Sequence, residues 1–267
     1  VCHWVWGPHG WIKEFGAKDF AGGTVVHVCS ATSALVAAAL LGPRGALARG
    51  AQAEPHNVPF VVLGGALLWF GWIGFNGGSA LAADRTAALA TLNTCTAAAA
   101  SLVTWAALER VRSGRTSAVG LVTGAVVGLV VITPAAGFVR PWYAMVMGLL
   151  GCALTYPAFL LRHPRVDDAS DAFCSHGVAG IVGMAFTGVF AKEGGLVSGG
   201  GLRLLGVQLA ACVAVVAYAA AASAVLFFAV DNCITLRVSM EKEGAGLDAA
   251  IHQERAYGRA GPGAPPE

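Results

Sequence analysis

The chain has 267 residues, of which 56% are hydrophobic and only 12% are charged, with a net charge of +2 and a mean hydropathy of +0.66. Soluble domains carry about 25% charged residues, so this composition excludes an ordinary water-soluble domain and indicates a membrane protein. So small a net charge gives no reason to expect a nucleic-acid partner.

Charged or Pro/Gly-rich gaps separate long apolar segments, each near the length of about twenty residues that crosses a hydrocarbon core roughly 30 Å thick. The fold class expected from this pattern is all-α, a polytopic membrane helix bundle. Small residues such as Gly124 and Gly128, or Gly177, Gly180 and Gly183, share helix faces and favour close packing. We predict seven spans, at residues 20–42, 58–83, 86–108, 117–137, 141–161, 173–191 and 204–230.

An odd number of spans places the two ends of the chain on opposite sides of the membrane. Lysine and arginine are concentrated in the connections on one side, which is typical of the cytoplasmic face. We therefore predict that Val1 lies outside and Glu267 inside. The basic residues of the predicted cytoplasmic side are Arg44, Arg49, Arg110, Arg112, Arg115, Arg162, Arg165, Arg237, Lys242, Arg255 and Arg259.

Two histidines, His27 and His176, fall inside predicted spans. An ionisable side chain at membrane depth usually faces a cavity or a partner, and the alternative is a neutral histidine bonded to a neighbouring helix. His27 follows Asp19 by eight residues, about 12 Å along a helix, and His176 follows Asp171 by five. Because the two spans run in opposite directions, both imidazoles approach mid-depth, as in inverted-repeat transporters. Two neutral imidazoles offer a donor and an acceptor to a small polar solute such as ammonia.

The second predicted span ends in an aromatic run at residues 68–80. Stacked rings near the outer end of a span can restrict entry and offer π faces to a cation, with the Ser79 hydroxyl as a polar partner. The alternative is the aromatic belt that lies at membrane interfaces. Asp19 and Asp171 each precede an apolar run, where a carboxylate caps free helical N–H groups.

Other classes of protein fit the sequence less well. The cysteines form no CxxC pair and have no histidine at metal-ligand spacing, so we expect no metal site and no cofactor. A retinal protein needs a lysine in its last span, and a seven-helix receptor would leave the histidines and aspartates without a role. These features favour transport over enzymatic activity. The lysines, all outside the predicted spans, are Lys13, Lys18, Lys192 and Lys242.

Several stretches resemble the ammonium transporter, methylammonium permease and Rhesus family, in the order in which the family has them. The resemblance runs from near residue 1 to about Tyr257 and implies transport of ammonium or ammonia, with methylammonium as an analogue. An ammonium sensor on the same scaffold is the alternative, and measurable substrate flux distinguishes the two. The stretches are residues 19–27 (DFAGGTVVH), 68–79 (LWFGWIGFNGGS), 132–137 (ITPAAG), 171–183 and 187–191.

The resemblance also implies roles for the matched residues at the centre of the pore. His27 and His176 correspond to the paired pore histidines, and Asp19 corresponds to an aspartate needed for substrate binding. The residues expected to support the site from close by are Asp171, Trp72 and Asn76.

Further matched residues belong to the outer vestibule. Phe75 corresponds to one of two stacked phenylalanines that gate the pore. Trp6 and Ser79 match the tryptophan and serine that help to hold the ammonium ion, and Trp4 and Trp11 compete with Trp6 for this assignment.

Members of the family have eleven spans, in two inverted halves of five plus a final helix, and are typically homotrimers with one pore in each subunit. The resemblance covers spans five to eleven. We therefore predict a membrane domain at residues 1–234 without its first four spans, and we expect a fragment or a truncated gene product. These residues alone are not expected to conduct ammonium, because four helices of the pore wall are absent.

Residues 235–267 are expected to form a cytoplasmic tail that is disordered at its end. The part from Leu236 to Tyr257 resembles a family tail that contacts a neighbouring subunit, and a cytoplasmic regulator is an expected partner there. The expected location is the plasma membrane, as a multi-pass protein in contact with lipid.

Overall fold

The computed structural model describes residues 1–45, 55–161 and 166–254, and the regular secondary structure in these ranges is helical. They contain seven helices long and apolar enough to cross a membrane, which confirms the predicted multi-pass helix bundle. The spans are η1 (Gly23–Val28) continuing as α3 (Cys29–Leu41), α5 (Val58–Gly78), α6 (Arg85–Ser113), α7 (Ala118–Ile132) continuing as η2 (Thr133–Ala135), α8 (Pro141–Leu160), η3 (Phe173–Val178) continuing as α9 (Ala179–Phe190), and α10 (Arg203–Cys233).

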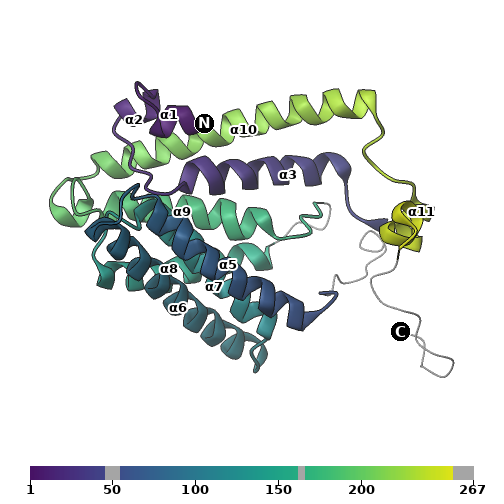
Figure 1. Ribbon diagram of the computed structural model, residues 1–267, viewed down its shortest axis with the longest axis horizontal. Coiled ribbons are helices and arrows are strands. Elements are labelled where there is room, and N and C mark those ends of the chain that lie inside the picture. The colour runs from purple at the N-terminus through teal and green to yellow at the C-terminus, as the bar shows by residue number, and fades with distance from the viewer. Residues whose placement is uncertain (46–54, 162–165, 255–267) are drawn as a thin grey trace.

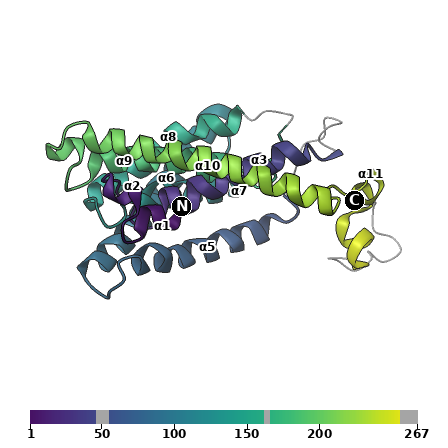
Figure 2. The same ribbon diagram turned by 90° about the horizontal axis from the view of Figure 1, so that it is seen from above.

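Short helices lie at both ends of this bundle (Figure 1). Near the end where α10 begins are α1 (Cys2–Trp6), α2 (Trp11–Glu14) and η4 (Leu196–Ser198). Beyond the opposite end lies α11 (Met240–Ala245), which is followed by η5 (Asp248–His252). Figure 2 shows α5 along one side of the bundle, opposite α9. The first helix and the tail thus lie near opposite ends, as an odd number of crossings requires.

Some predicted features lie outside the described residues. They are the basic residues Arg49, Arg162, Arg165, Arg255 and Arg259 and the expected disordered end of the tail. The orientation of the chain in the membrane stays a prediction.

Two observed helices, α5 and α6, end five residues from the predicted ends of their spans, and the other five spans end within three residues of the prediction. The second span was expected to reach residue 83, but α5 ends at Gly78 because Leu81 has a left-handed φ of 58° and the Asp84 carboxylate caps the next helix. The third was expected to end at residue 108, but α6 continues to Ser113 and ends at Gly114, with φ 76°. Left-handed glycine is a common helix stop. The last turn of α6 is charged, so hydropathy does not reveal that it is helical.

Small residues bring α6, α7 and α8 into backbone contact at the centre of the bundle. A Cβ atom added at Gly128 of α7 would lie 2.5 Å from the Ala97 carbonyl oxygen and 2.5 Å from Cβ of Ser101. Gly148 of α8 lies against the same Ala97 carbonyl. The spacing of small residues therefore predicted this packing correctly.

Replacing Gly128 by alanine is expected to lower the midpoint of thermal unfolding, because the added methyl meets backbone that cannot move without shifting α6. Overpacking of this kind costs about 1–3 kcal/mol. Gly74→Ala on α5 is the matched control, since no described atom lies within 4 Å of its added Cβ and alanine favours helix. Circular dichroism in detergent measures both variants. A G128A midpoint equal to that of the unaltered protein would contradict the prediction.

Candidate functional site

Two spans open with a π-helical turn, and each turn carries one of the predicted histidines. His27 lies in η1 and His176 in η3, and each turn continues directly as an α-helix. A π turn widens the backbone locally and is frequent at functional sites. The hydrophobic pattern of the sequence gives no sign of either turn.

The two imidazoles are in contact with each other. Nδ1 of His27 lies 3.1 Å from Nδ1 of His176, and the ring centroids are 5.1 Å apart. With both rings neutral, one Nδ1 donates and the other accepts, so the rings take different tautomers. His27 is only 2% exposed, and none of the described residues bonds its Nε2 atom. The predicted meeting of the two rings is present, and it places an unsatisfied polar atom in an apolar interior.

Trp72 of α5 lies nearly parallel to both imidazoles. Its ring is 5.3 Å from that of His27, at 18°, and 6.3 Å from that of His176, at 15°. The buried indole N–H donates to the Thr133 hydroxyl (3.0 Å), which in turn donates to the Leu129 carbonyl (2.8 Å). Trp72 is therefore fixed by α7 and η2 and closes one side of the histidine pair.

Phe75 follows Trp72 on the next turn of α5, and Ser79 is the C-cap residue of that helix. The Phe75 ring lies 6.0 Å from that of His27 and 5.6 Å from that of Trp72, and the residue is 39% exposed. The Ser79 hydroxyl donates to the Phe75 carbonyl (2.8 Å). Phe75 thus borders the histidines, while the Ser79 hydroxyl is bonded to the last turn of α5.

Asn76, which was expected beside the site, is fully buried between α5 and α6. Its amide nitrogen donates to the Thr94 hydroxyl (2.9 Å), and that hydroxyl donates to the Ala90 carbonyl (2.6 Å). No described residue bonds Oδ1 of Asn76. The side chain links the helix that carries Trp72 to α6.

The Asp19 carboxylate is 6% exposed and caps η1, as predicted. Both of its oxygens accept hydrogen bonds from the protein, so the carboxylate fixes the local backbone. Its negative charge can therefore act on a nearby cation only through space and not by direct contact. Its donors are the backbone N–H groups of Gly22 (2.8 Å), Gly23 (2.6 Å), Thr24 (2.8 Å) and Val25 (3.4 Å), and the Thr24 hydroxyl (2.6 Å).

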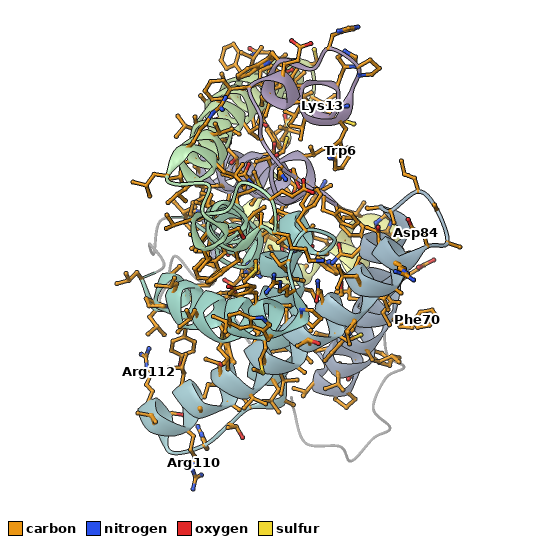
Figure 3. The ribbon with its side chains drawn as sticks, turned by 90° about the vertical axis from the view of Figure 1, so that its left-hand side faces the viewer. Trp6, Lys13, Phe70, Asp84, Arg110 and Arg112 are labelled. Carbon is orange, nitrogen blue, oxygen red and sulfur yellow. The ribbon has the colours of Figure 1, made fainter. Side chains whose placement is uncertain are left out.

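Of the three N-terminal tryptophans that were considered, Trp6 is bonded to Asp19. Its indole N–H donates to the Asp19 carbonyl (2.8 Å). Trp4 instead packs against Tyr218 of α10 at 4.7 Å and Trp11 at 5.8 Å. Trp6 lies at the end of the bundle that faces the viewer in Figure 3, near Lys13 of α2. Trp6 and Ser79 each donate to a backbone carbonyl.

A second carboxylate contacts the start of the helix that carries His176. Asp168, which the sequence pattern did not single out, accepts from the Phe173 N–H (2.6 Å). The cap by the Asp171 carboxylate stays a prediction, and the Asp171 carbonyl accepts from the backbone and hydroxyl of Ser175 (2.9 and 2.8 Å). Asp168 precedes His176 by eight residues, the same spacing as Asp19 to His27. That equal spacing was the signal that could have identified it.

An ion pair joins the segment that follows α3 to the segment that precedes η3, at the end of the bundle near the C-terminal tail. Arg44 bonds both carboxylate oxygens of Asp167, at 2.6 and 2.8 Å, and its backbone N–H donates to the same group (2.9 Å). The bond from Arg44 holds the pKa of the Asp167 carboxyl below its ordinary value. Close by, the Arg237 guanidinium donates to the carbonyls of residues 41–43 and to Glu243 (3.0 Å). The start of the tail is thereby attached to the end of α3.

The Asp167 pair is expected to make stability depend on pH in the acid range. Because the folded pKa is lowered, its contribution is fully present above the unfolded pKa of about 3.9 and is lost as pH falls through the folded pKa. Solvent screening keeps the effect below about 1 kcal/mol. Unfolding midpoints of the unaltered protein and Asp167→Asn should differ at pH 7 and converge below about pH 4. Asp248→Asn on the exposed tail is the control, and a constant difference down to pH 3 would contradict the prediction.

The fold and the site define a multi-pass membrane protein in which two oppositely directed helices meet at a pair of histidines, of which His27 is buried. The chain belongs to the Ammonium Transporter Family, whose model matches residues 1–257. It is 42% identical over 265 residues to the ammonium transporter of Bacillus subtilis, covering 96% of this chain and 65% of that relative. It is also 42% identical over 273 residues to ammonium transporter 1 of Schizosaccharomyces pombe, covering 96% of this chain and 54% of the relative.

Solved structures show the same fold. Mep2 of Saccharomyces cerevisiae superimposes with a TM-score of 0.81 at 37% identity, over 89% of this chain and 57% of that one. A protein described as a sensor Amt protein superimposes with a TM-score of 0.86 at 35% identity, over 93% and 65%. The chain thus spans between about half and two thirds of the length of these relatives.

Proposed function

We propose that this protein carries ammonium or ammonia across a membrane, along a path that passes the His27–His176 pair. The observation that carries the proposal is the Nδ1 contact of 3.1 Å between two imidazoles supplied by oppositely directed spans. Membership of the Ammonium Transporter Family supports the substrate. Relatives named as transporters support a transport function rather than an enzymatic one, and no observation favours the sensor alternative.

The chemistry of the centre suits a small solute with both hydrogen-bond donors and an acceptor. The free Nε2 of His27 can donate to or accept from ammonia, depending on the tautomer that the Nδ1 contact imposes. Trp72 stacks on one side of both rings and offers no hydrogen bond to a hydrated cation there, because its indole N–H is bonded to Thr133. We therefore propose that the substrate passes this point with its hydration removed and its hydrogen bonds replaced by imidazole nitrogens.

At the outer end, we propose that Asp19, Trp6, Phe75 and Ser79 form the entrance. The buried Asp19 charge orients the η1 backbone and attracts a cation from a short distance. The exposed faces of Trp6 and Phe75 offer π surfaces to such a cation. The Phe75 ring lies 6.0 Å from that of His27, and we propose that it gates the passage between the entrance and the histidine pair.

We also propose a homotrimer in the plasma membrane, with residues 1–234 as the membrane domain and residues 235–267 as a cytoplasmic tail. Arg237 and Glu243 attach the start of the tail to the chain's own α3. The side chains that remain exposed on the described part of the tail are available to a neighbouring subunit or a cytoplasmic regulator. They are Glu241, Lys242, Asp248 and Glu254.

The test is uptake by cells that lack ammonium transport of their own. The complete coding sequence is expected to restore growth on low ammonium and to give saturable uptake of labelled methylammonium that unlabelled ammonium competes away. Cells with an empty vector provide the background. Protein that is correctly inserted in the membrane but produces no saturable uptake would contradict the proposal.

A further inference from the structure

The segment that carries Asp19 is not part of a helix, and hydrogen bonds from other parts of the chain hold it in place. Residues 17–20 run between α2 and η1 without regular structure, and we call them the Asp19 linker. The Asp19 carbonyl accepts from Trp6 (2.8 Å), and the Phe20 N–H donates to the Pro134 carbonyl (3.0 Å). The position of Asp19 therefore depends on contacts that distant parts of the chain make with this linker.

Another of these contacts comes from Gln208, in the second turn of the apolar helix α10. Its amide oxygen accepts from the Lys18 N–H (2.8 Å), and its amide nitrogen donates to the Lys18 carbonyl (2.6 Å). The side chain is 0% exposed. A flipped amide would place donor against donor and acceptor against acceptor, so the two bonds define its orientation.

A buried glutamine at this position lowers the stability of the fold unless its amide forms hydrogen bonds. Burying an amide without hydrogen-bond partners is unfavourable, and fixing a glutamine side chain adds a loss of conformational entropy. The neighbours of Gln208 on α10 are apolar, and an apolar side chain would fill the space without these costs. The two bonds to Lys18 offset the cost and satisfy the peptide group on each side of the Lys18 Cα.

We infer that Gln208 is a positioning residue for Asp19, and that through it the last span, α10, determines the geometry of the substrate entrance. The inference rests on the proposed function of Asp19. Gln208 fixes the peptide that joins Lys18 to Asp19, which sets the direction in which Asp19 leaves the linker. The carboxylate then meets the N–H groups of residues 22–25 at the start of η1.

The variant that tests this is Gln208→Leu, which keeps the approximate volume and removes both bonds. The complete protein is expected to show an increase of about tenfold in the KM for methylammonium uptake, the scale of one or two lost hydrogen bonds, with Vmax changed by less than about twofold. Gln208→Glu keeps the acceptor for the Lys18 N–H and loses the donor, so an intermediate KM is expected.

Ser223→Ala is the matched control on the same helix. It removes a hydrogen bond of 2.8 Å between the hydroxyls of Ser223 and Ser33, which joins α10 to α3 about 22 Å from Gln208 along the helix. Its KM is expected to be unchanged. An equal rise of KM in S223A and Q208L would mean that general loosening of α10 is responsible, and would overturn the inference.

Hydrogen exchange gives a measurement that does not depend on transport. In Q208L, the amides of the Asp19 linker and of residues 22–25 are expected to exchange faster, while those of α6 stay unchanged. Unchanged exchange in the linker, or an unaltered KM, would overturn the inference even if the protein transports ammonium. Failure of both Q208L and Q208E to fold, with S223A folding normally, would also overturn it in favour of a purely structural role.

Discussion

Asp19→Ala is expected to abolish saturable methylammonium uptake, the largest effect of any single substitution considered for this protein. The carboxylate accepts from the first N–H groups of η1 and from the Thr24 hydroxyl, all within a site that is 6% exposed. Alanine would leave these donors buried without partners and would remove the negative charge. The π turn that carries His27 would lose its cap, so both the entrance and the centre would change.

Asp19→Asn is expected to leave at most part of the activity. Asparagine keeps one acceptor oxygen for the N–H groups of Gly22 and Gly23. Its amide nitrogen would then face the N–H and hydroxyl of Thr24, where the carboxylate has its second oxygen. The substitution therefore preserves half of the cap and none of the charge.

The matched control is Asp84→Ala, at the end of the bundle shown in Figure 3. Asp84 caps α6 with bonds of 2.8 and 3.0 Å to two backbone N–H groups, but it is exposed and distant from the histidines in sequence. Losing this cap is expected to cost about 1 kcal/mol of stability and little uptake. Uptake is compared at matched amounts of protein in the membrane. Full activity in D19A would reduce Asp19 to a dispensable cap.

The sequence was sufficient to predict the seven spans and the meeting of His27 with His176. Long apolar segments mark the spans because the bilayer requires them, and a histidine inside such a segment is conspicuous because burying it is costly. The direction of each span follows from its number along the chain. These signals are local, so no knowledge of packing was needed.

The residues that the sequence did not reveal depend on contacts between distant segments. Asp168 precedes His176 by the same eight residues that separate Asp19 from His27, but only the folded chain shows that its carboxylate reaches the Phe173 N–H. Gln208 and Lys18 are 190 positions apart, and nothing in a single sequence joins them. The contact of Trp72 with both imidazoles likewise depends on how α5 packs across η1 and η3. The π turns depend on backbone geometry that periodicity does not encode.

The second large effect is expected at the histidine pair itself. His27→Ala and His176→Ala each remove one partner of the 3.1 Å contact, leaving the other Nδ1 unsatisfied beside Trp72. We expect either change to reduce methylammonium uptake about tenfold or to alter the selectivity for ammonium over other cations.

The double variant H27A/H176A separates a paired role for these two histidines from two independent roles. It should be little worse than either single variant, because residues that act as a pair are not additive. His9→Ala is the control, since His9 is a surface histidine whose Nδ1 lies 3.4 Å from Glu14. Uptake and competition by other cations are measured for all four variants. Unchanged flux and selectivity in both single variants would rule out a role for the pair, and fully additive losses would show that each imidazole contacts the substrate independently.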